Sequence, residues 1–566
     1  MRTLKLFLLL ASAILLTSPL FGQGVNSGDL RVNVTDPQGQ PVANASVIAR
    51  NGAKGIERVA SGNGDGQYSF LSLPPGSYVV LVNAQGFAKA SAPNVVITVG
   101  GSLELPVSLS LASATETVEV SGAPQAIETT QTSGTDTVDQ RQIDNLPING
   151  RNAIGFAKTD SMVLPDSAPN TGAAPTSGIN FGGQRARSNL FNVDGADATD
   201  NSINGVRSTV SQEDVQEFQI ITNGYSPEYG RAAGGVVNIV TKSGSNNFHG
   251  DVFGYLRNRN FQAVNPFSNV PDPAYTRVQA GTAFGGAIKK DKTFYFFSYE
   301  VTRRHETGFS SIGQGNFGLA PFDTSNVGLP FGTLQLTPAQ IGFLTNPTVL
   351  ATEGASPAYA QEVGQYAGFV GASSGMAVNA AWPTGMTGGF PGVGGFPSSC
   401  SSPPCFVPSS FQSLASQMGN FPVFEGTSLY SFRIDHNVSN SNRLTLRANV
   451  SPSTVTGIEV SGQDQPFGQN AYSRTSEQTY RDVAGVVQDA WTLGPNKLNQ
   501  FTFQYARRGL SYFYNTAIPG GSDPAVNIPG FAYFGREPYS YIQRTEQRYQ
   551  FADNFSWTIG QHNTKF

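Results

Sequence analysis

Three aspartates at a regular spacing form the densest group of candidate metal ligands in the sequence. Asp194, Asp197 and Asp200 could present carboxylate oxygens to Ca2+. An EF-hand loop also needs a glutamate at its last position, and the residue there is Gly205. We therefore expect these aspartates to stabilise turns. The sequence predicts neither a metal site nor another cofactor.

Patterns typical of enzyme active sites occur only in glycine-rich sequence. Residues 371–375 fit a nucleophile elbow and residues 313–318 fit a dinucleotide-binding loop, but neither has the strand–turn–helix context that these sites need. The histidines are scattered and form no zinc motif; they are His249, His305, His436 and His562. We predict that the chain is not an enzyme.

The N-terminus indicates export. Arg2 and Lys5 precede an apolar run at 6–16, which is too short to span a bilayer but suits a signal peptide, so we expect residues 1–22 to be removed. In an oxidising compartment, Cys400 and Cys405 are expected to form a local disulfide. A metal site there would lack further Cys or His ligands nearby.

The composition excludes several classes of protein. Of 566 residues, 13% are charged and 39% hydrophobic, and 64 are Gly. The 35 Lys and Arg residues do not exceed the 39 Asp and Glu residues, so the attraction that drives nucleic-acid binding is missing. Low charge excludes a charge-driven disordered chain, and the slightly polar mean hydropathy excludes a helical membrane protein. A large all-β protein or a membrane β-barrel remains.

The elements that must position these residues begin with a predicted β-sandwich over residues 23–112. Short apolar stretches alternate with turns, and the expected strands are 30–35, 45–50, 67–73, 77–83, 95–99 and 103–111. Residues 36–47, 66–70 and 73–78 resemble the carboxypeptidase regulatory-like domain. The resemblance implies a prealbumin-like sandwich with a carbohydrate-binding-like fold. A sugar site would need exposed aromatic rings, whereas we expect Tyr68, Phe70 and Tyr78 in the core.

Residues 113–134 are rich in Thr, Ser, Glu and Gln and are predicted to form a linker. Within it, one pentapeptide resembles the TonB box of outer-membrane transporters; it consists of Glu116, Thr117, Val118, Glu119 and Val120. Such a segment would add to a partner as an edge strand. The alternative is that it forms the last strand of the sandwich or the first strand of the next domain.

Residues 135–248 resemble the plug domain of Oar-like TonB-dependent transporters, which implies an α+β fold. The resemblance rests on residues 146–152, 180–185, 188–195, 215–220, 225–231 and 234–244, and its motif residues are Asn149, Gly150, Arg151, Asp194, Gly195, Glu217, Tyr229, Gly230, Arg231, Gly234 and Gly235. Gly234 and Gly235 permit close backbone approach before a buried strand at 236–240. Glu217, Glu228 and Arg231 are candidates for polar contacts between plug and barrel wall, or else ordinary surface charges.

From residue 249 onward the sequence predicts antiparallel strands of a transmembrane β-barrel. Residues 430–435 and 444–450 alternate between apolar and polar side chains, with Arg433, Asp435 and Arg447 on the inward face. The same pattern recurs at 501–505 and 549–557, and residues 294–299 are dense in aromatic side chains. Residues 306–424 lose strand signals and are expected to form a long extracellular loop.

The chain is identified as a member of the Oar-like TonB-dependent transporters of the Gram-negative outer membrane, with its N-terminal domain in the periplasm. The resemblance implies a TonB-type partner, outer-membrane lipid and an extracellular ligand; a siderophore, an oligosaccharide and a peptide all fit. The alternatives are an adhesion or structural barrel without transport and a secreted carbohydrate-binding protein.

The length predicts an incomplete barrel. Transporters of this type have about 22 strands. Residues 249–566, without the long loop, hold enough for roughly eight to ten strands of about 10 residues each. We therefore expect an open, curved sheet and a chain that ends part-way round its barrel.

Overall fold

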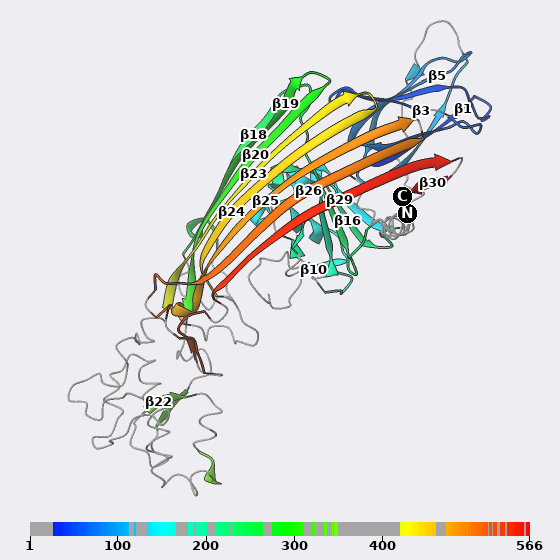
Figure 1. Ribbon diagram of the computed structural model, residues 1–566. Helices are drawn as coiled ribbons and strands as arrows, with labels where there is room; N and C mark the ends of the chain where they lie inside the picture. Colours follow the sequence, from blue (N-terminus) through cyan, green and yellow to red (C-terminus); the bar gives the residue numbers. More distant parts are fainter. Residues whose placement is uncertain are drawn as a thin grey trace, which may run out of the picture.

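The protein is described by a computed structural model in which three β-rich parts pack together (Figure 1). The residues described are 26–111 without 61, 118–119, 133–165, 179–225 without 186–187, 201–204 and 207–209, 229–263, 274–310, short stretches between 320 and 348, 419–459, and 471–566 without 495, 519, 523, 529–531, 538–539 and 560–561. In these ranges no helix has both the length and the apolar character needed to cross a membrane.

The first part, here called the N-terminal sandwich, contains two packed sheets. Its strands are β1 (Gly28–Thr35), β2 (Ser46–Asn51), β3 (Ile56–Ala60), β4 (Gln67–Leu73), β5 (Gly76–Asn83), β6 (Ala90–Ile97), β7 (Ser102–Ser108) and β8 (Val118–Glu119). One sheet has the order β4-β1-β7 and the other β3-β2-β5-β6-β8. Tyr68, Phe70 and Tyr78 are buried, as predicted, so these three rings offer no sugar platform. Strand β3 was not predicted.

The second part, here called the inner segment, comprises the described residues from 133 to 244. Its main sheet has the order β13-β12-β17-β16-β9. Its elements are β9 (Gly134–Val138), α2 (Gln140–Asn145), η1 (Asn149–Arg151), η2 (Ala153–Thr159), β10 (Val163–Pro165), β11 (Ile179–Phe181), β12 (Leu190–Val193), β13 (Ala196–Asp197), β14 (Thr199–Asp200), β15 (Gly205–Val206), η4 (Gln212–Asp214), β16 (Val215–Asn223) and β17 (Val236–Thr241). The predicted α+β composition is confirmed.

Local sequence explains why these elements form. Helix α2 begins with a capping box in which Asp139 and Gln142 each bond the other's backbone N–H, so two otherwise unpaired donors are satisfied. Strand β17 is buried along its whole length because it lies between two neighbouring strands and is covered on both faces. The predicted buried strand at 236–240 is therefore confirmed.

The third part, here called the outer sheet, has nine antiparallel strands among the described residues. In spatial order they are β18 (His249–Asn258), β19 (Tyr275–Lys289), β20 (Thr293–Ser310), β23 (Gly419–Ser439), β24 (Asn442–Glu459), β25 (Thr475–Gly494), β26 (Lys497–Tyr514), β29 (Ile542–Ile559) and β30 (His562–Lys565). The sheet is curved and open, with β18 and β30 at its edges, as predicted (Figure 1).

The outer sheet also departs from the sequence prediction in its strand lengths. Strands β20, β23 and β25 have 18, 21 and 20 residues, about twice the length expected for crossing the bilayer alone. Strands β20 and β23 remain paired as far as Ser310 and Gly419, so the strand ends lie inside the predicted loop of 306–424. The described part of that loop holds the hairpin β21 (Ala320–Asp323) and β22 (Thr333–Leu336).

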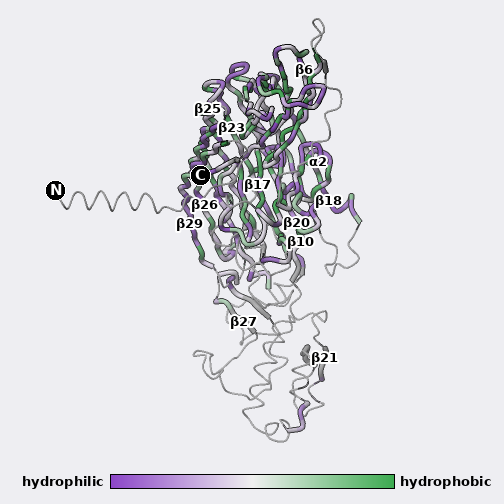
Figure 2. The backbone as a smooth tube through the Cα atoms, turned by 90° about the vertical axis from the view of Figure 1, so that its right-hand side faces the viewer, coloured by the Kyte–Doolittle hydropathy of each residue, from purple (hydrophilic) through white to green (hydrophobic). Residues whose placement is uncertain are grey.

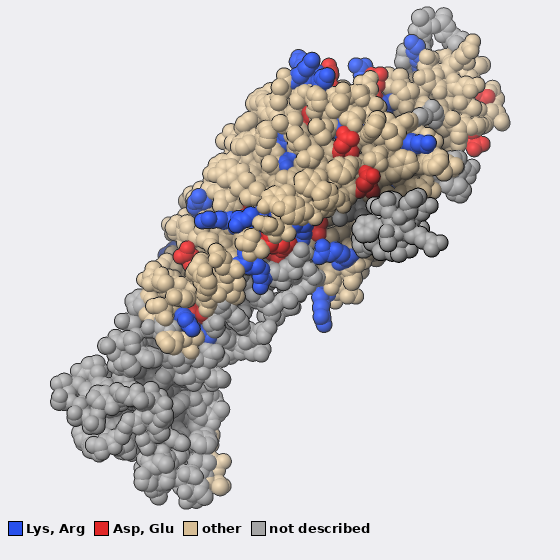
Figure 3. Space-filling view, viewed as in Figure 1, with Lys and Arg blue, Asp and Glu red and all other residues tan. Residues whose placement is uncertain are grey.

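The two faces of the outer sheet differ in polarity. On β23, Tyr430 and Phe432 are exposed on one face, whereas Ser431, Asp435 and their neighbours are buried on the other. The hydropathy colouring alternates accordingly along these strands, and uncharged residues cover most of the face seen in the space-filling view (Figures 2 and 3). This is the predicted pattern for strands between lipid and a polar interior.

The two ends of the outer sheet also differ. At one end neighbouring strands are joined by tight connections, as at Ser439–Asn442 and Gly494–Lys497. The N-terminal sandwich lies at this end, where Asn437 donates to the carbonyl of Lys54 and Arg58 donates to Thr492 Oγ1. Longer connections, such as that between β26 and β29, lie at the opposite end.

Candidate functional site

The inner segment meets the outer sheet through a tight turn. Strands β12 and β13 pair Val193 with Ala196, and the two residues between them, Asp194 and Gly195, both have positive φ, at 49° and 70°. Asp-Gly is the sequence that a type I′ hairpin turn favours, because both central residues need this conformation. The turn places the Asp194 carboxylate against the outer sheet.

Asp194 connects three elements. Its Oδ2 lies 2.8 Å from Nε of Arg447 on β24, and its Oδ1 lies 3.4 Å from Nη1 of Arg433 on β23. The same carboxylate accepts hydrogen bonds from the backbone N–H and the hydroxyl of Thr241, at 2.8 and 2.7 Å. Two guanidinium groups and two neutral donors therefore surround this buried carboxylate, and they compensate it for the loss of contact with water.

The charge network continues along the outer sheet. Arg433 also pairs with Asp435, at 2.9 Å between Nε and Oδ2. Arg443 lies 3.1 Å from the other oxygen of Asp435, which accepts a hydrogen bond from Thr445 as well. Carboxylates and guanidinium groups therefore alternate from Asp194 of the inner segment through Arg433 and Asp435 to Arg443.

A second contact forms at the end of the same hairpin. Arg548 on β29 lies 3.1 Å from Oδ2 of Asp197 and donates to the carbonyls of Asp197 and Thr199. Gln550 accepts a hydrogen bond from the Asp197 backbone N–H at 3.0 Å. Because several of these bonds involve backbone groups, they position the hairpin whatever its other side chains are.

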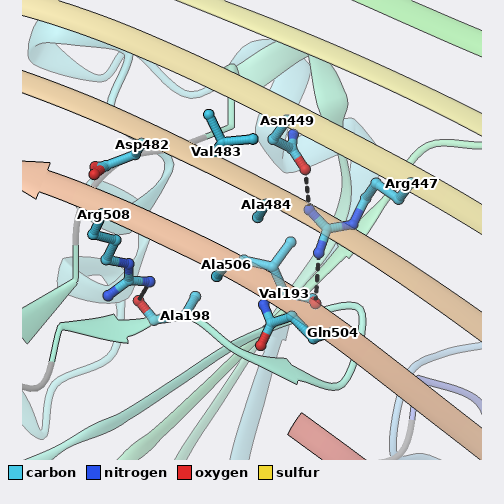
Figure 4. A pocket seen from close by; sticks show the side chains of 10 residues that line it. All are labelled: Val193, Ala198, Arg447, Asn449, Asp482, Val483, Ala484, Gln504, Ala506 and Arg508. Carbon is cyan, nitrogen blue, oxygen red and sulfur yellow. Dashed lines mark hydrogen bonds between the residues drawn. The ribbon is translucent and has the colours of Figure 1, made fainter. Parts of the chain in front are cut away.

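The space between these contacts is small. A cavity of about 20 Å3 lies between the hairpin and strands β24 to β26, and Arg447 and Arg508 project into it (Figure 4). Arg447 donates to the carbonyl of Val193, and Arg508 donates to the carbonyl of Ala198 at 2.6 Å. Such a volume holds a single water molecule. The packed inner segment leaves no room for a substrate at this point.

A separate contact is made by the predicted motif residues Gly150 and Arg151. Arg151 pairs with Glu213 at 2.6 Å and with Glu300 of β20 at 3.5 Å, and its guanidinium lies 4.1 Å from the ring centroid of Phe253 on β18. Gln279 of β19 donates to the carbonyl of Gly150. Charge pairing and a cation–π contact thus hold this turn against three strands.

The two glycines of the predicted close approach are confirmed in that role. A Cβ atom at Gly234 would overlap Oδ1 of Asn189, and one at Gly235 would overlap the ring of Phe181. Tyr229 packs against the small cluster of Leu190, Ile221 and Val236. Asn149 is the first residue of η1. Gly230 and Arg231 lie in the connection that leads to β17.

The three charged residues that the sequence offers as candidates for contacts with the barrel wall have different surroundings. Glu217 accepts a hydrogen bond from Val99 N–H at 2.7 Å, so it contacts the N-terminal sandwich instead of the wall. Arg231 pairs at 3.2 Å with Asp197, which in turn contacts Arg548 of the wall. Glu228 lies outside the described residues. Burial raises the pKa of Glu217 to about 7.

Sequence reasoning missed several residues of this interface, among them Gln488, Arg508, Arg548 and Gln550. Alternation of polar with apolar side chains along the strand was the available signal for only some of them. Gln550, for example, lies on the inward face of a predicted strand, beside the exposed Phe551. Nothing in the local sequence, however, shows which turn of the inner segment such a side chain meets.

Other predicted sites are only partly described. The backbone of Val118 and Glu119 forms β8, which pairs in parallel with Ala90 and Ser91 of β6, so this piece extends the sandwich. The predicted signal peptide, Glu116, Thr117, Val120, Cys400 and Cys405 lie outside the described residues. In the described ranges no three His, Cys, Asp or Glu side chains gather to hold a metal; Asp194 and Asp197 bind arginines.

Comparisons with known proteins identify two regions. A family model described as an outer membrane beta barrel domain matches residues 240–566. A model of the carboxypeptidase regulatory-like domain matches residues 29–110, which confirms the predicted resemblance of the sandwich. The TonB-dependent transporter Oar of Myxococcus xanthus is 31% identical over 314 residues, an alignment that covers 52% of this chain. The chain spans 29% of the length of that relative.

Two solved structures align with part of the chain. The transporter YddB of Escherichia coli aligns with a TM-score of 0.44 at 10% identity, over 76% of this chain and 47% of its own. A mutant ferric enterobactin receptor, PfeA of Pseudomonas aeruginosa, aligns with a TM-score of 0.40 at 11% identity, over 75% and 47%.

The domain match and the curated relative place the protein in the outer membrane of a Gram-negative bacterium. Because the barrel model spans more than half of the sequence, and the outer sheet has the expected alternation, the chain belongs to the outer membrane beta barrel family.

Proposed function

We propose that the protein carries a large or scarce nutrient across the outer membrane as a TonB-dependent transporter, with the inner segment as its plug. The observation that carries this proposal is the arginine–carboxylate interface between Asp194, Asp197 and the outer sheet. The relative from Myxococcus xanthus, a TonB-dependent transporter, supports it. We assign the protein no catalytic role, in line with that relative.

A polar interface suits a plug that has to move. Charged and hydrogen-bonding groups such as Arg447 and Arg548 can exchange their protein partners for water when the plug shifts. An apolar interface of the same area would instead expose apolar surface to water and resist the shift by about 25 cal/mol per Å2. The plug is thus held in one position at rest, yet its release costs less than the opening of an apolar core.

The orientation follows from the two ends of the outer sheet. Barrels of this kind have short periplasmic turns and longer extracellular loops. The end with tight connections carries the N-terminal sandwich, so the sandwich and the linker after it would lie in the periplasm. A TonB-type protein would reach residues 116–120 there, while a siderophore, oligosaccharide or peptide would bind at the opposite end.

Val118 provides the test of the TonB box. Proline at this position removes a backbone N–H that strand addition to TonB would use, whereas threonine keeps the N–H and the β-branched shape. We expect Val118→Pro to abolish co-purification with the TonB C-terminal domain and Val118→Thr to retain it. In a deletion strain, growth on iron–siderophore, oligosaccharide or peptide supplied as a scarce nutrient should follow the same order.

Either of two results would contradict this assignment. Co-purification that survives Val118→Pro would exclude these residues as the box. Uptake of every tested nutrient at the rate of the deletion strain would favour the adhesion barrel, which needs no energy-transducing partner.

A further inference from the structure

A second cavity, of about 90 Å3, lies where the N-terminal sandwich, the inner segment and the outer sheet meet. We call it the junction cavity. Four of its lining side chains are cations: Lys54 and Arg58 of the sandwich, and Arg433 and Arg443 of the outer sheet. Two are carboxylates, Asp194 and Asp489. The junction cavity is therefore lined by more positive than negative charge.

Its carboxylates already have partners. Asp194 is engaged by Arg433, Arg447 and Thr241, as described above. Asp489 accepts a hydrogen bond from Asn442 at 2.9 Å. Two of the cations, Lys54 and Arg443, can still donate a hydrogen bond to a further acceptor. Lys54 Nζ donates to two neutral oxygens, the carbonyl of Pro75 and Oε1 of Gln216, at 3.2 and 3.3 Å.

Arg443 is the cation with the clearest need for a further hydrogen-bond acceptor. Only 8% of its surface is exposed, and while Nη2 binds Asp435, Nη1 is buried with no hydrogen-bond partner among the described residues. The hydroxyl of Ser27, which lines the same cavity, is likewise buried without a partner in the described part of the chain. A buried donor without an acceptor costs about 1–3 kcal/mol, and more when it is charged.

We propose that the junction cavity binds a small inorganic oxyanion, such as sulfate or phosphate, between Lys54 and Arg443. An oxyanion supplies the acceptors that Arg443 and Ser27 lack and offsets the surplus positive charge. The volume equals that of about three water molecules, which is enough for a tetrahedral oxyanion. A lipid headgroup does not fit this role, because the buried Arg443 and the half-buried Arg433 lie on the face of the sheet opposite to its exposed apolar side chains.

The oxyanion would join the sandwich to the outer sheet. Lys54 and Ser27 belong to the first and Arg443 to the second, so one ligand bridges both. Protonation of Lys54 should be coupled to this binding. Burial lowers the pKa of Lys54 to about 7. Arg443 and Arg433 also lower this pKa, whereas Asp435 and Glu217 raise it. A bound anion favours charged Lys54, so sulfate should bind more tightly at pH 6 than at pH 8.

Sulfate is the appropriate probe because its charge does not change over this pH range. Binding of radiolabelled sulfate to the detergent-solubilised full chain is measured by equilibrium dialysis. We expect saturable binding at one site, weakened about tenfold or more in Lys54→Met through loss of a charge-assisted hydrogen bond. Lys89, an exposed lysine of the same sandwich, supplies the control, and Lys89→Met should bind like the wild type.

A second variant distinguishes loss of the site from misfolding of the protein. Ser27→Ala removes one unpartnered hydroxyl without touching any ion pair, and it should weaken sulfate binding several-fold with an unchanged circular dichroism spectrum. Absence of saturable binding to the wild type would overturn the proposal. So would Lys54→Met and Ser27→Ala variants that both bind sulfate as the wild type does.

Discussion

Arg447 and Asp194 form a buried ion pair, 2.8 Å between Nε and Oδ2, with only 3% of each side chain exposed. The arginine belongs to β24 of the outer sheet and the aspartate to a turn of the inner segment, more than 250 positions earlier in the sequence. Breaking such a pair from one side is costly, because the remaining charge stays buried and uncompensated. The stability of the contact between the proposed plug and the outer sheet should therefore depend strongly on this pair.

Replacement of Asp194 should loosen the β12–β13 hairpin. In Asp194→Asn the amide can still bond Thr241, but Arg447 and Arg433 lose their carboxylate. We expect the free energy of local opening, from hydrogen exchange of the hairpin amides, to fall by about 3–5 kcal/mol. Asp136→Asn changes an exposed aspartate of β9 in the same segment and should leave it unchanged. Equal effects of the two variants would show that the ion pair does not hold the hairpin.

The turn itself can be tested at Gly195. Its φ of 70° lies in the left-handed region, where an L-residue is strained by about 1–2 kcal/mol. Gly195→Ala should lower the opening free energy of the same amides by about that amount. Gly485→Ala on β25 is the matched control, because a Cβ there meets open space. A hairpin as stable in Gly195→Ala as in the wild type would contradict the assigned turn geometry.

Sequence reasoning succeeded where a pattern is local. Alternation along residues 430–435 correctly placed Arg433 and Asp435 on the inward face, because side chains of a strand alternate strictly. Gly234 and Gly235 were correctly expected to allow close approach, since a side chain there would meet Asn189 and Phe181. Each of these properties depends on residues that are neighbours in sequence or in one strand.

The same reasoning could not identify partners across the chain. Glu217 was a candidate for a contact with the barrel wall or for an ordinary surface charge, but it is buried and contacts Val99, because the inner segment touches the sandwich as well as the outer sheet. Arg548 lies 351 positions from Asp197, and an arginine on an inward face has many carboxylates within its reach in principle. Which pair forms depends on the packing of whole elements, so it emerges only when the three parts are assembled.

The other contact of the proposed plug can be examined at Arg151. Lysine there keeps the charge but loses the planar group that reaches Glu213 and Glu300 together while stacking over Phe253. We expect Arg151→Lys to lower the opening free energy of η1 amides by about 1–3 kcal/mol. Arg141→Lys, at an exposed position of α2, is the control. If both variants behave alike, charge alone accounts for this contact.

Docking of the N-terminal sandwich is expected to be weakest near pH 7. Burial raises the pKa of Glu217 from 4.5 to about 7 in the docked state, although the Val99 N–H and Lys54 act to lower it. The docked state therefore binds the Glu217 proton more tightly than the undocked state does. Docking therefore weakens as pH rises from 4.5 to 7. Burial lowers the pKa of Lys54 from 10.5 to about 7, so the undocked state binds the lysine proton more tightly, and docking strengthens as pH rises from 7 to 10.5.

The Val99 amide reports this docking directly, since its N–H bonds Glu217 across the interface. Its exchange, corrected for the intrinsic pH dependence, should show a protection minimum near pH 7 in the wild type. Glu217→Gln should flatten the profile below pH 7 because glutamine has no proton to lose, whereas Lys54→Met should flatten it above pH 7. Lys89→Met should keep both limbs. A protection profile that rises or falls steadily across pH 7 in the wild type would show that these two groups do not govern docking. If protection in Glu217→Gln still falls as pH rises toward 7, another carboxyl group causes that part of the profile.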